Sequence, residues 1–304
     1  MGYRLQPARE RSAECRRVFD KGLLEALTRL DLYPETDTEG LHEARKNIKR
    51  IRSLLRLLRN RTFNPRRKEL NAGLRSINQS LSSNRDREVQ IALLKQWSDR
   101  PASEGTLREA CRRLASFHER ETQPHPDIDP ALRLHIHRRM AEIRHTLQNA
   151  DLGKISGKRL RKTLERREGN MLEARMDFME NPGIDTLHNW RKRLKDLMYQ
   201  RDLVRDVLGL KAGKTKRIKK LEGLLSDARD CDLLLENLRG GVHGDLPAVQ
   251  IGVLVYHFES EKERLLGKAG KLSGKLFGPL TPRRPQSGSE PQSSPGPTPP
   301  AGNG

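Results

Sequence analysis

The chain has 304 residues, which is enough for one large domain or two domains of ordinary size. Hydrophobic residues make up 34% of it and aromatic residues only 4%, a composition that argues against a sheet-rich fold and favours thin helical layers. The chain has 60 Lys and Arg residues and 40 Asp and Glu residues, so its formal net charge is +20. Because of this excess of positive charge, we expect a stripe, groove or pore that attracts phosphate-rich partners.

Apolar residues recur at helical spacing along most of the chain. Steps of three and four place one apolar face on the segment that contains Leu41, Ala44, Ile48, Ile51, Leu55 and Leu58. Similar runs lie, in chain order, near residues 18–30, 70–94, 107–117, 132–147, 160–179, 187–208, 218–238 and 249–266. Breakers such as Asn64-Pro65 and Asn181-Pro182-Gly183 separate these runs. We therefore predict an all-α fold of roughly eight helices, followed by a disordered tail rich in Pro, Ser and Gly at residues 281–304.

Two segments of the chain repeat each other. The run Leu41-His-Glu-Ala-Arg-Lys-Asn-Ile-Lys and the run Leu187-His-Asn-Trp-Arg-Lys-Arg-Leu-Lys are identical at five of nine positions. A second echo follows each run after a similar interval, Arg85-Asp86 in the first half and Arg229-Asp230 in the second. These matches predict a duplicated unit of four helices, with residues 1–150 as the first helical-bundle repeat and residues 151–280 as the second.

Each repeat carries a strip of basic side chains opposite its apolar face. Residues three and four apart are neighbours on a helix, so these strips are nearly continuous. Their members are His42, Arg45, Lys46, Lys49, Arg50 and Arg52 in the first half, and His188, Arg191, Lys192 and Lys195 in the second. The guanidinium group of arginine can bind two phosphate oxygens at once, and lysine adds a point charge. Histidine donates a hydrogen bond and, when protonated, adds a further positive charge. We expect the two strips to converge, across an approximate twofold axis, on one groove or pore.

A basic helix face is more often simply solvated, but a solvated face has no reason to repeat His, Arg, Lys and Lys at the same offsets. For Arg85-Asp86 and Arg229-Asp230 we favour a structural role, with the aspartates as salt-bridge partners. No recognisable catalytic signature, phosphate loop or metal-ligand spacing is present. We therefore expect a binding protein without catalytic residues, cofactor or metal. A nucleic-acid binder and a phosphohydrolase are the alternatives, and few aromatic residues argue against stacking on single strands.

Cysteine usage and the absence of an apolar run bear on location. Cys15, Cys111 and Cys231 are an odd number of widely spaced cysteines, so we expect free thiols in a reducing compartment. The basic N-terminus is not followed by an apolar run, and no stretch approaches the length of a membrane span. These features predict a cytoplasmic protein that does not cross a membrane.

The run His-x-x-Arg-Lys-x-x-Lys-Arg-x-Arg that starts at His42, its partial copy from His188 and the two Arg-Asp echoes closely resemble the CHAD domain, the conserved-histidine alpha-helical domain. The similarity extends over about residues 8–278. It implies two pseudosymmetric four-helix bundles around a basic central groove or pore, a stand-alone module that binds inorganic polyphosphate, and association with polyphosphate granules. Carried over by position, the family's motif falls on the ten residues of the two strips. The second half departs from the motif at Asp196 and Met198, which implies fewer phosphate contacts there.

Overall fold

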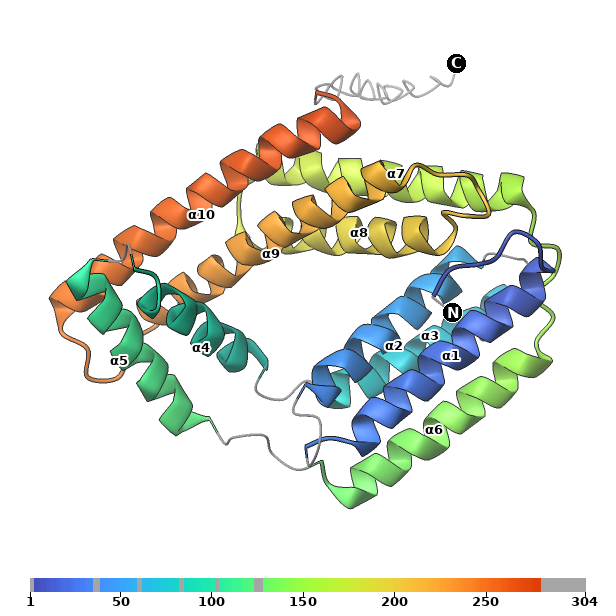
Figure 1. Ribbon diagram of the computed structural model, residues 1–304, viewed down its shortest axis with the longest axis horizontal. Helices are drawn as coiled ribbons and strands as arrows, with labels where there is room; N and C mark the ends of the chain where they lie inside the picture. The colour runs from blue at the N-terminus through green and yellow to red at the C-terminus, as the bar shows by residue number, and fades with distance from the viewer. Residues whose placement is uncertain are drawn as a thin grey trace, which may run out of the picture.

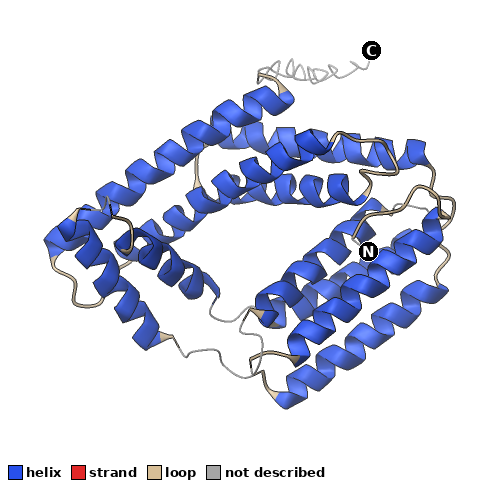
Figure 2. Cartoon of the chain, in the orientation of Figure 1, coloured by secondary structure: helices blue, strands red, loops and turns tan. Residues whose placement is uncertain are grey.

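The computed structural model describes residues 3–34, 39–58, 62–81, 85–101, 104–122 and 128–279, without the side chains of residues 85 and 86. Every regular element in these ranges is a helix (Figures 1 and 2). In chain order the helices are α1 (Arg11–Asp31), α2 (Gly40–Leu57), α3 (Asn64–Ser80), α4 (Arg85–Ser98), α5 (Gly105–Glu121), α6 (Pro130–Asn149), α7 (Gly157–Glu180), α8 (Ile184–Leu203), α9 (Ala212–Arg239) and α10 (Ala248–Phe277). The all-α prediction is confirmed over the described residues, whereas the predicted tail at residues 281–304 lies outside them.

The described ranges contain ten helices where the sequence indicated roughly eight. One cause is the apolar run at residues 70–94, which we took as a single element. The structure divides it between α3, which ends at Ser80, and α4, which begins at Arg85. The sequence between the two helices is Leu-Ser-Ser-Asn, and Ser and Asn favour turns because their side chains compete for backbone hydrogen bonds. Because the apolar spacing continues from one helix into the next, it did not reveal the boundary between α3 and α4.

The helices pack in groups that do not follow chain order. Helices α1, α2, α3 and α6 form one group, in which α1 and α3 each contact both α2 and α6. Helices α7, α8, α9 and α10 contact one another in sequence, and α4 and α5 pack on α9 and α10 at their far end (Figure 1). Residues 85–121 thus pack on helices from beyond residue 150. The two repeats and their pseudosymmetry stay predictions.

Helix α2 crosses α8 near the centre of the molecule. The amide Nε2 of Gln200 on α8 donates to the backbone oxygen of Ser53 on α2 at 3.2 Å, and Gln200 is fully buried. Ile48 and Leu55 of α2 and Leu194 and Leu197 of α8 are also buried. This crossing fixes the position of each basic strip relative to the other.

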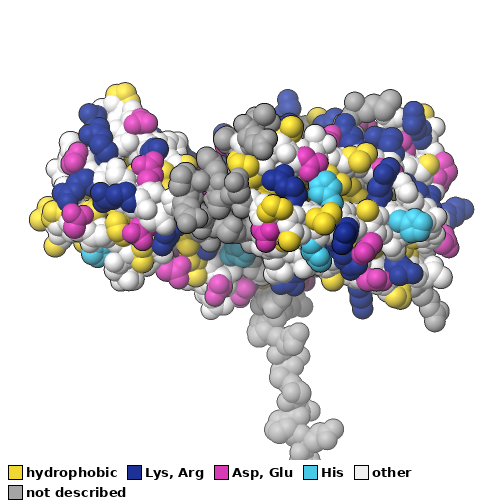
Figure 3. All heavy atoms as spheres, turned by 90° about the horizontal axis from the view of Figure 1, so that it is seen from below, with side chains coloured by type: hydrophobic (Ala, Val, Ile, Leu, Met, Phe, Trp, Pro, Cys, Tyr) yellow, Lys and Arg dark blue, Asp and Glu magenta, His cyan; other side chains and the backbone are white. Residues whose placement is uncertain are grey.

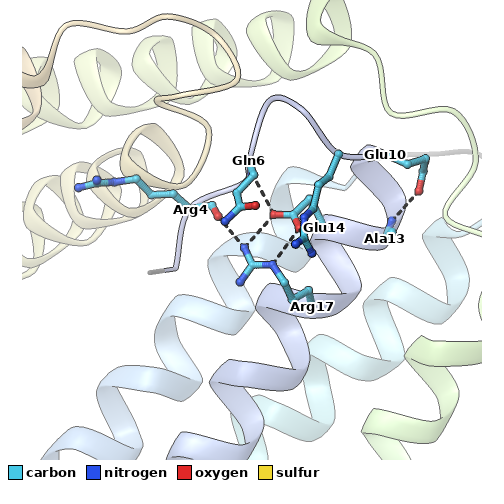
Figure 4. Close-up of polar contacts among 7 residues, drawn as sticks. Arg4, Gln6, Glu10, Ala13, Glu14 and Arg17 are labelled. Carbon is cyan, nitrogen blue, oxygen red and sulfur yellow. Dashed lines mark hydrogen bonds and ion pairs between the residues drawn. The ribbon is translucent and has the colours of Figure 1, made fainter. Parts of the chain in front are cut away.

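The N-terminal segment is tied to α1 by a buried carboxylate, Glu14. Its Oε2 accepts a hydrogen bond from the backbone nitrogen of Gln6 at 3.0 Å, and both Nε and Nη2 of Arg17 donate to the same carboxylate (Figure 4). Arg17 also donates to the backbone oxygen of Arg4 at 2.9 Å. These hydrogen bonds, those of Arg17 first, lower the pKa of Glu14 in spite of its burial. At the start of α1 the side chain of Glu10 accepts from the backbone nitrogens of the first turn.

All three cysteines are buried and unbridged, as predicted. Burial raises the pKa of each thiol to about 12, so none is a reactive thiolate at neutral pH. None of the helices in the described ranges combines the length and the hydropathy that a bilayer crossing requires.

Gly22 sets the distance between α1 and α2. A Cβ atom there would lie 2.7 Å from Cγ1 of Ile51 and 3.2 Å from the ring of Tyr3. We expect Gly22→Ala to lower the unfolding free energy, because the clash with a stiff β-branched side chain outweighs the gain in helix propensity. Gly223→Ala on α9, where a Cβ meets nothing within 4 Å, should raise it by about 0.5–1 kcal/mol. Urea unfolding of both variants measures the difference, and equal stabilisation would contradict close α1–α2 packing at Gly22.

Candidate functional site

A cleft of about 510 Å³ lies between α2, α8 and α9, with the N-terminal segment at its edge. Apolar side chains of α2 and α8, namely Ile51, Leu54, Met198 and Leu203, contribute to its lining. Its basic lining residues are His42, Arg4, Arg45, Lys46, Lys49, Arg50, Lys195, Arg205, Lys216 and Lys219. Within the described residues, the carboxylates that line it are Asp202 and Glu222. The excess of cations predicts a strongly positive potential inside the cleft.

Five of the six residues of the first strip line this cleft: His42, Arg45, Lys46, Lys49 and Arg50. They point one way because positions three, four and seven apart share a helix face. Nη1 of Arg50 donates to Oδ1 of Asn47 at 3.2 Å, and its guanidinium lies 4.9 Å from the ring centroid of Tyr3. Nζ of Lys46 pairs with Oε1 of Glu43 at 2.7 Å. Arg45 is only 9% exposed, so its charge is held within the fold rather than on a solvated face.

Arg52, the sixth residue of the first strip, does not line the cleft. Its Nε donates to Oδ1 of Asn71 on α3 at 3.2 Å, and the neighbouring Arg56 pairs with Asp196 of α8. Burial, and after it the positive charge of Arg56, lowers the pKa of Arg52 to about 10, a shift that Asp196 opposes and Arg75 increases. The structure therefore places Arg52 near Arg56 of α2 and Arg75 of α3 and outside the cleft lining.

Of the second strip, Lys195 lines the cleft and the others lie along α8 beyond it. Arg191 and Lys195 are joined through Glu222 of α9, whose Oε1 lies 3.4 Å from Nη2 of Arg191 and 3.2 Å from Nζ of Lys195. Arg191 also donates to Oγ of Ser226 at 2.9 Å. Lys192 is exposed. The second strip is thus continuous with the cleft through one shared ion-pair network.

His188 is exposed near the N-terminal end of α8, at the first position of the second strip. Burial first, then the positive charges of Arg229, Arg191 and Lys192, lowers the pKa of His188 below the ordinary value of 6.5. The ring is therefore largely neutral at neutral pH, and a nearby anion would favour its protonation.

Several cleft residues were not among the predicted site residues. Arg4 is placed by the N-terminal segment, where the backbone nitrogen of Leu5 donates to the oxygen of Leu203 at 2.9 Å. Lys216 and Lys219 lie on one face of α9, at a spacing of three. The run Lys214-Thr-Lys-Arg-Ile-Lys-Lys220 was a visible basic signal for α9, but its orientation was not. Nothing in the sequence around Arg4 or Arg205 indicated that they would meet α2.

The two carboxylates of the cleft differ in their exposure. Asp202 pairs with Nε of Arg4 at 3.0 Å and with Nη1 of Arg205 at 3.8 Å, and its side chain is 41% exposed. The side chain of Glu222 is only 13% exposed. Tyr199, also in the lining, stays a neutral hydrogen-bond donor because burial raises the pKa of its phenol to about 12.

Neither Arg229 nor Asp230 of the second Arg-Asp echo lines the cleft. The side chains of Arg85 and Asp86 lie outside the described residues, so their structural role stays a prediction. Asp230 lines a smaller pocket between α4, α9 and α10, whereas Arg229 lies near enough to His188 to lower the pKa of that ring. Within the described ranges no group of three or more His, Cys, Asp and Glu side chains is arranged to hold a metal ion.

Basic residues alone do not distinguish the cleft from the rest of the surface. On the face seen in Figure 3, Lys and Arg are spread widely, with Asp and Glu among them. In the cleft, cations from the N-terminal segment, α2, α8 and α9 surround one volume in which acids are few. Such an arrangement can bind an anion at several points at once.

The family model for the CHAD domain matches residues 17–215. A search of curated proteins gives no match. The matched segment contains both basic strips and the helices α2 and α8 that carry them. The match covers well over half of the 304 residues. The chain therefore belongs to the CHAD domain family.

Proposed function

We propose that the protein binds inorganic polyphosphate in the cleft between α2, α8 and α9. The observation that carries this proposal is the convergence of nine Lys and Arg side chains, from separate segments of the chain, on a volume with two carboxylates in its described lining. A phosphate chain presents a charge at every unit and no bases, so it matches a cleft whose described lining has nine Lys and Arg but only two aromatic side chains, Tyr3 and Tyr199. Membership of the CHAD family supports the same ligand, and with it association with polyphosphate granules in the cytoplasm.

The binding mechanism is multivalent ion pairing. Arg45 and Arg50 donate to phosphate oxygens through their guanidinium forks, while Lys46, Lys49 and Lys195 add point charges along the chain. The Thr215 hydroxyl, which is buried at the cleft and has no partner among the described residues, is available to a polar ligand. Because each ion pair releases counterions from the polymer, affinity should fall steeply as salt concentration rises.

Competition against nucleic acid tests the choice of ligand. We expect long-chain polyphosphate to displace duplex DNA or RNA from the protein at equal phosphate concentration, because a double helix is much wider than a single phosphate chain and does not fit into a cleft of about 510 Å³. Fluorescence anisotropy with labelled polyphosphate measures the competition. Displacement of polyphosphate by duplex nucleic acid would favour the nucleic-acid alternative. Release of phosphate in the same mixtures, with or without divalent metal, would favour the phosphohydrolase alternative.

Neutralising the cleft face of α2 tests the site. We expect Arg45→Gln with Lys49→Gln to weaken polyphosphate binding roughly a hundredfold, since hydrogen bonds to charged groups contribute about 1.5 kcal/mol each. The slope of log affinity against log salt should also flatten by about 0.7 for each cation lost. The matched control, Arg161→Gln with Lys162→Gln on the exposed face of α7, removes the same charge away from the cleft. Equal losses in the two variants would argue for non-specific attraction.

A variant of Arg52 distinguishes binding in the cleft from binding along the whole basic strip of α2. If binding follows the cleft, Arg52→Gln should weaken binding clearly less than Arg45→Gln, because Arg45 lines the cleft whereas Arg52 does not and is hydrogen-bonded to Asn71 of α3. Isothermal titration of both single variants gives the comparison. A larger loss for Arg52→Gln would show that the ligand follows the whole strip along α2 instead of the cleft.

The pKa of His188 predicts the pH dependence of binding. Because burial and neighbouring cations lower this pKa in the free protein, a bound phosphate chain should raise it, and binding should take up a proton. Affinity should therefore increase as the pH falls from about 7.5 towards 5.5, and level off once His188 is protonated in the free protein too. We expect His188→Gln to reduce this dependence at constant ionic strength. An unchanged pH profile in the variant would place His188 outside the ligand path.

A further inference from the structure

Glu222 lies where an oxygen of the ligand would be expected to lie. One carboxylate oxygen, Oε1, is 3.4 Å from Arg191 and 3.2 Å from Lys195, so it bridges two cations of the second strip. The side chains of Glu222, Arg191 and Lys195 are 13%, 17% and 24% exposed, respectively, which limits the screening of their charges by water. The same residue lines the cleft. A carboxylate oxygen between an arginine and a lysine is chemically close to a phosphate oxygen in the same place.

Asp202 also lies between two cleft cations, Arg4 and Arg205, but the acids near the other cleft cations are more exposed than Glu222. Glu43 pairs with Lys46 of the first strip, but it does not line the cleft and its side chain is 33% exposed. Asp202 does line the cleft, and its ion pair with Arg4 is exposed by about two fifths on each side. Exposed pairs of that kind contribute little, typically about 0–1 kcal/mol. Glu222 therefore neutralises the second strip more strongly than either acid neutralises its own neighbours.

We propose that Glu222 is an internal counter-ion that holds Arg191 and Lys195 until a polyphosphate chain displaces it, so that the second strip admits long chains and resists short anions. This inference rests on the proposed function and specifies its ligand class. A short anion must displace the carboxylate by its own affinity alone. A long chain first binds the α2 side of the cleft, and its next phosphates then compete with Glu222 at a high effective concentration. The release of Glu222 thus depends on chain length.

Removing the charge of Glu222 tests the proposal. We expect Glu222→Gln to raise the affinity for tripolyphosphate by roughly tenfold, since two cations become available for charge-assisted hydrogen bonds. Affinity for long chains should rise less, which reduces the preference for length. The affinity for tripolyphosphate should also depend more steeply on salt concentration, because more ion pairs form on binding. Titrations with tripolyphosphate and with long-chain polyphosphate at several salt concentrations measure these quantities.

Asp202→Asn is the matched control, because it removes one carboxylate from the same cleft. If only net charge matters, the two variants should gain affinity equally, and that result would overturn the proposal. Unchanged affinity of a folded Glu222→Gln variant, with wild-type helicity by circular dichroism, would overturn it too. If the wild-type protein binds neither tripolyphosphate nor long chains, the proposed function itself fails, which is a distinct outcome.

A double-mutant cycle identifies the cations that Glu222 holds. Arg191→Gln should weaken tripolyphosphate binding little in the wild-type chain, where Arg191 is occupied by Glu222 and Ser226. The same substitution should weaken it several-fold more in the Glu222→Gln background, where Arg191 is released. Additive effects would contradict the bridge. The measurement on Arg191→Gln alone needs no change at Glu222, and a large loss there would mean that Arg191 already binds the short anion.

Discussion

The site depends on like charges that the fold holds close together against their repulsion. Arg45 is nearly buried, Lys49 and Lys195 line the same cleft, and burial together with neighbouring arginines lowers the pKa of Arg52 to about 10. At Arg52 this environment makes the charged form less stable than it would be in water. Favourable packing elsewhere in the fold must offset the free-energy cost of holding these cations close together. A bound polyanion would lower that cost. This is a physical reason for a cleft of this kind to bind an anion of high charge.

The framework that holds these charges is apolar packing around the α2–α8 crossing. Leu and Ile side chains of both helices are buried there, and Gln200 forms a buried hydrogen bond to the backbone of α2. The N-terminal segment closes one edge of the cleft, because Glu14 and Arg17 bind its backbone and Leu5 bonds to the end of α8. The cations therefore sit on three rigid helices and one fastened segment, so little order has to be gained when a ligand binds.

The sequence predicts much of the fold and about half of the site. The spacing of apolar residues predicts an all-α fold, and the repeated His, Arg and Lys pattern identifies α2 and α8 as the helices that carry the basic strips. Both are predictable because each signal is local in the sequence. The cleft itself is a product of long-range packing. Arg4 and Arg205 join it through contacts of the N-terminal segment with α8 and its following turn, and no local pattern encodes those contacts. Arg52 fits the strip by helical phase, yet it is hydrogen-bonded to Asn71 of α3 and does not line the cleft with Lys49, which the pattern of a single helix cannot reveal.

The departure of the second strip from the family motif also has a structural reason. Asp196 occupies the position that corresponds to Arg50 of the first strip, which in sequence means only a lost cation. In the structure Asp196 pairs with Arg56 of α2, and its backbone oxygen accepts from Ser53 at 3.5 Å. The exchange of Arg for Asp thus links α8 to α2 on the side of the crossing where Arg52, Arg56 and Arg75 would otherwise repel one another without opposition. Asp196 does not line the cleft, so this acid joins α8 to α2 without adding a carboxylate to the described lining of the proposed binding site.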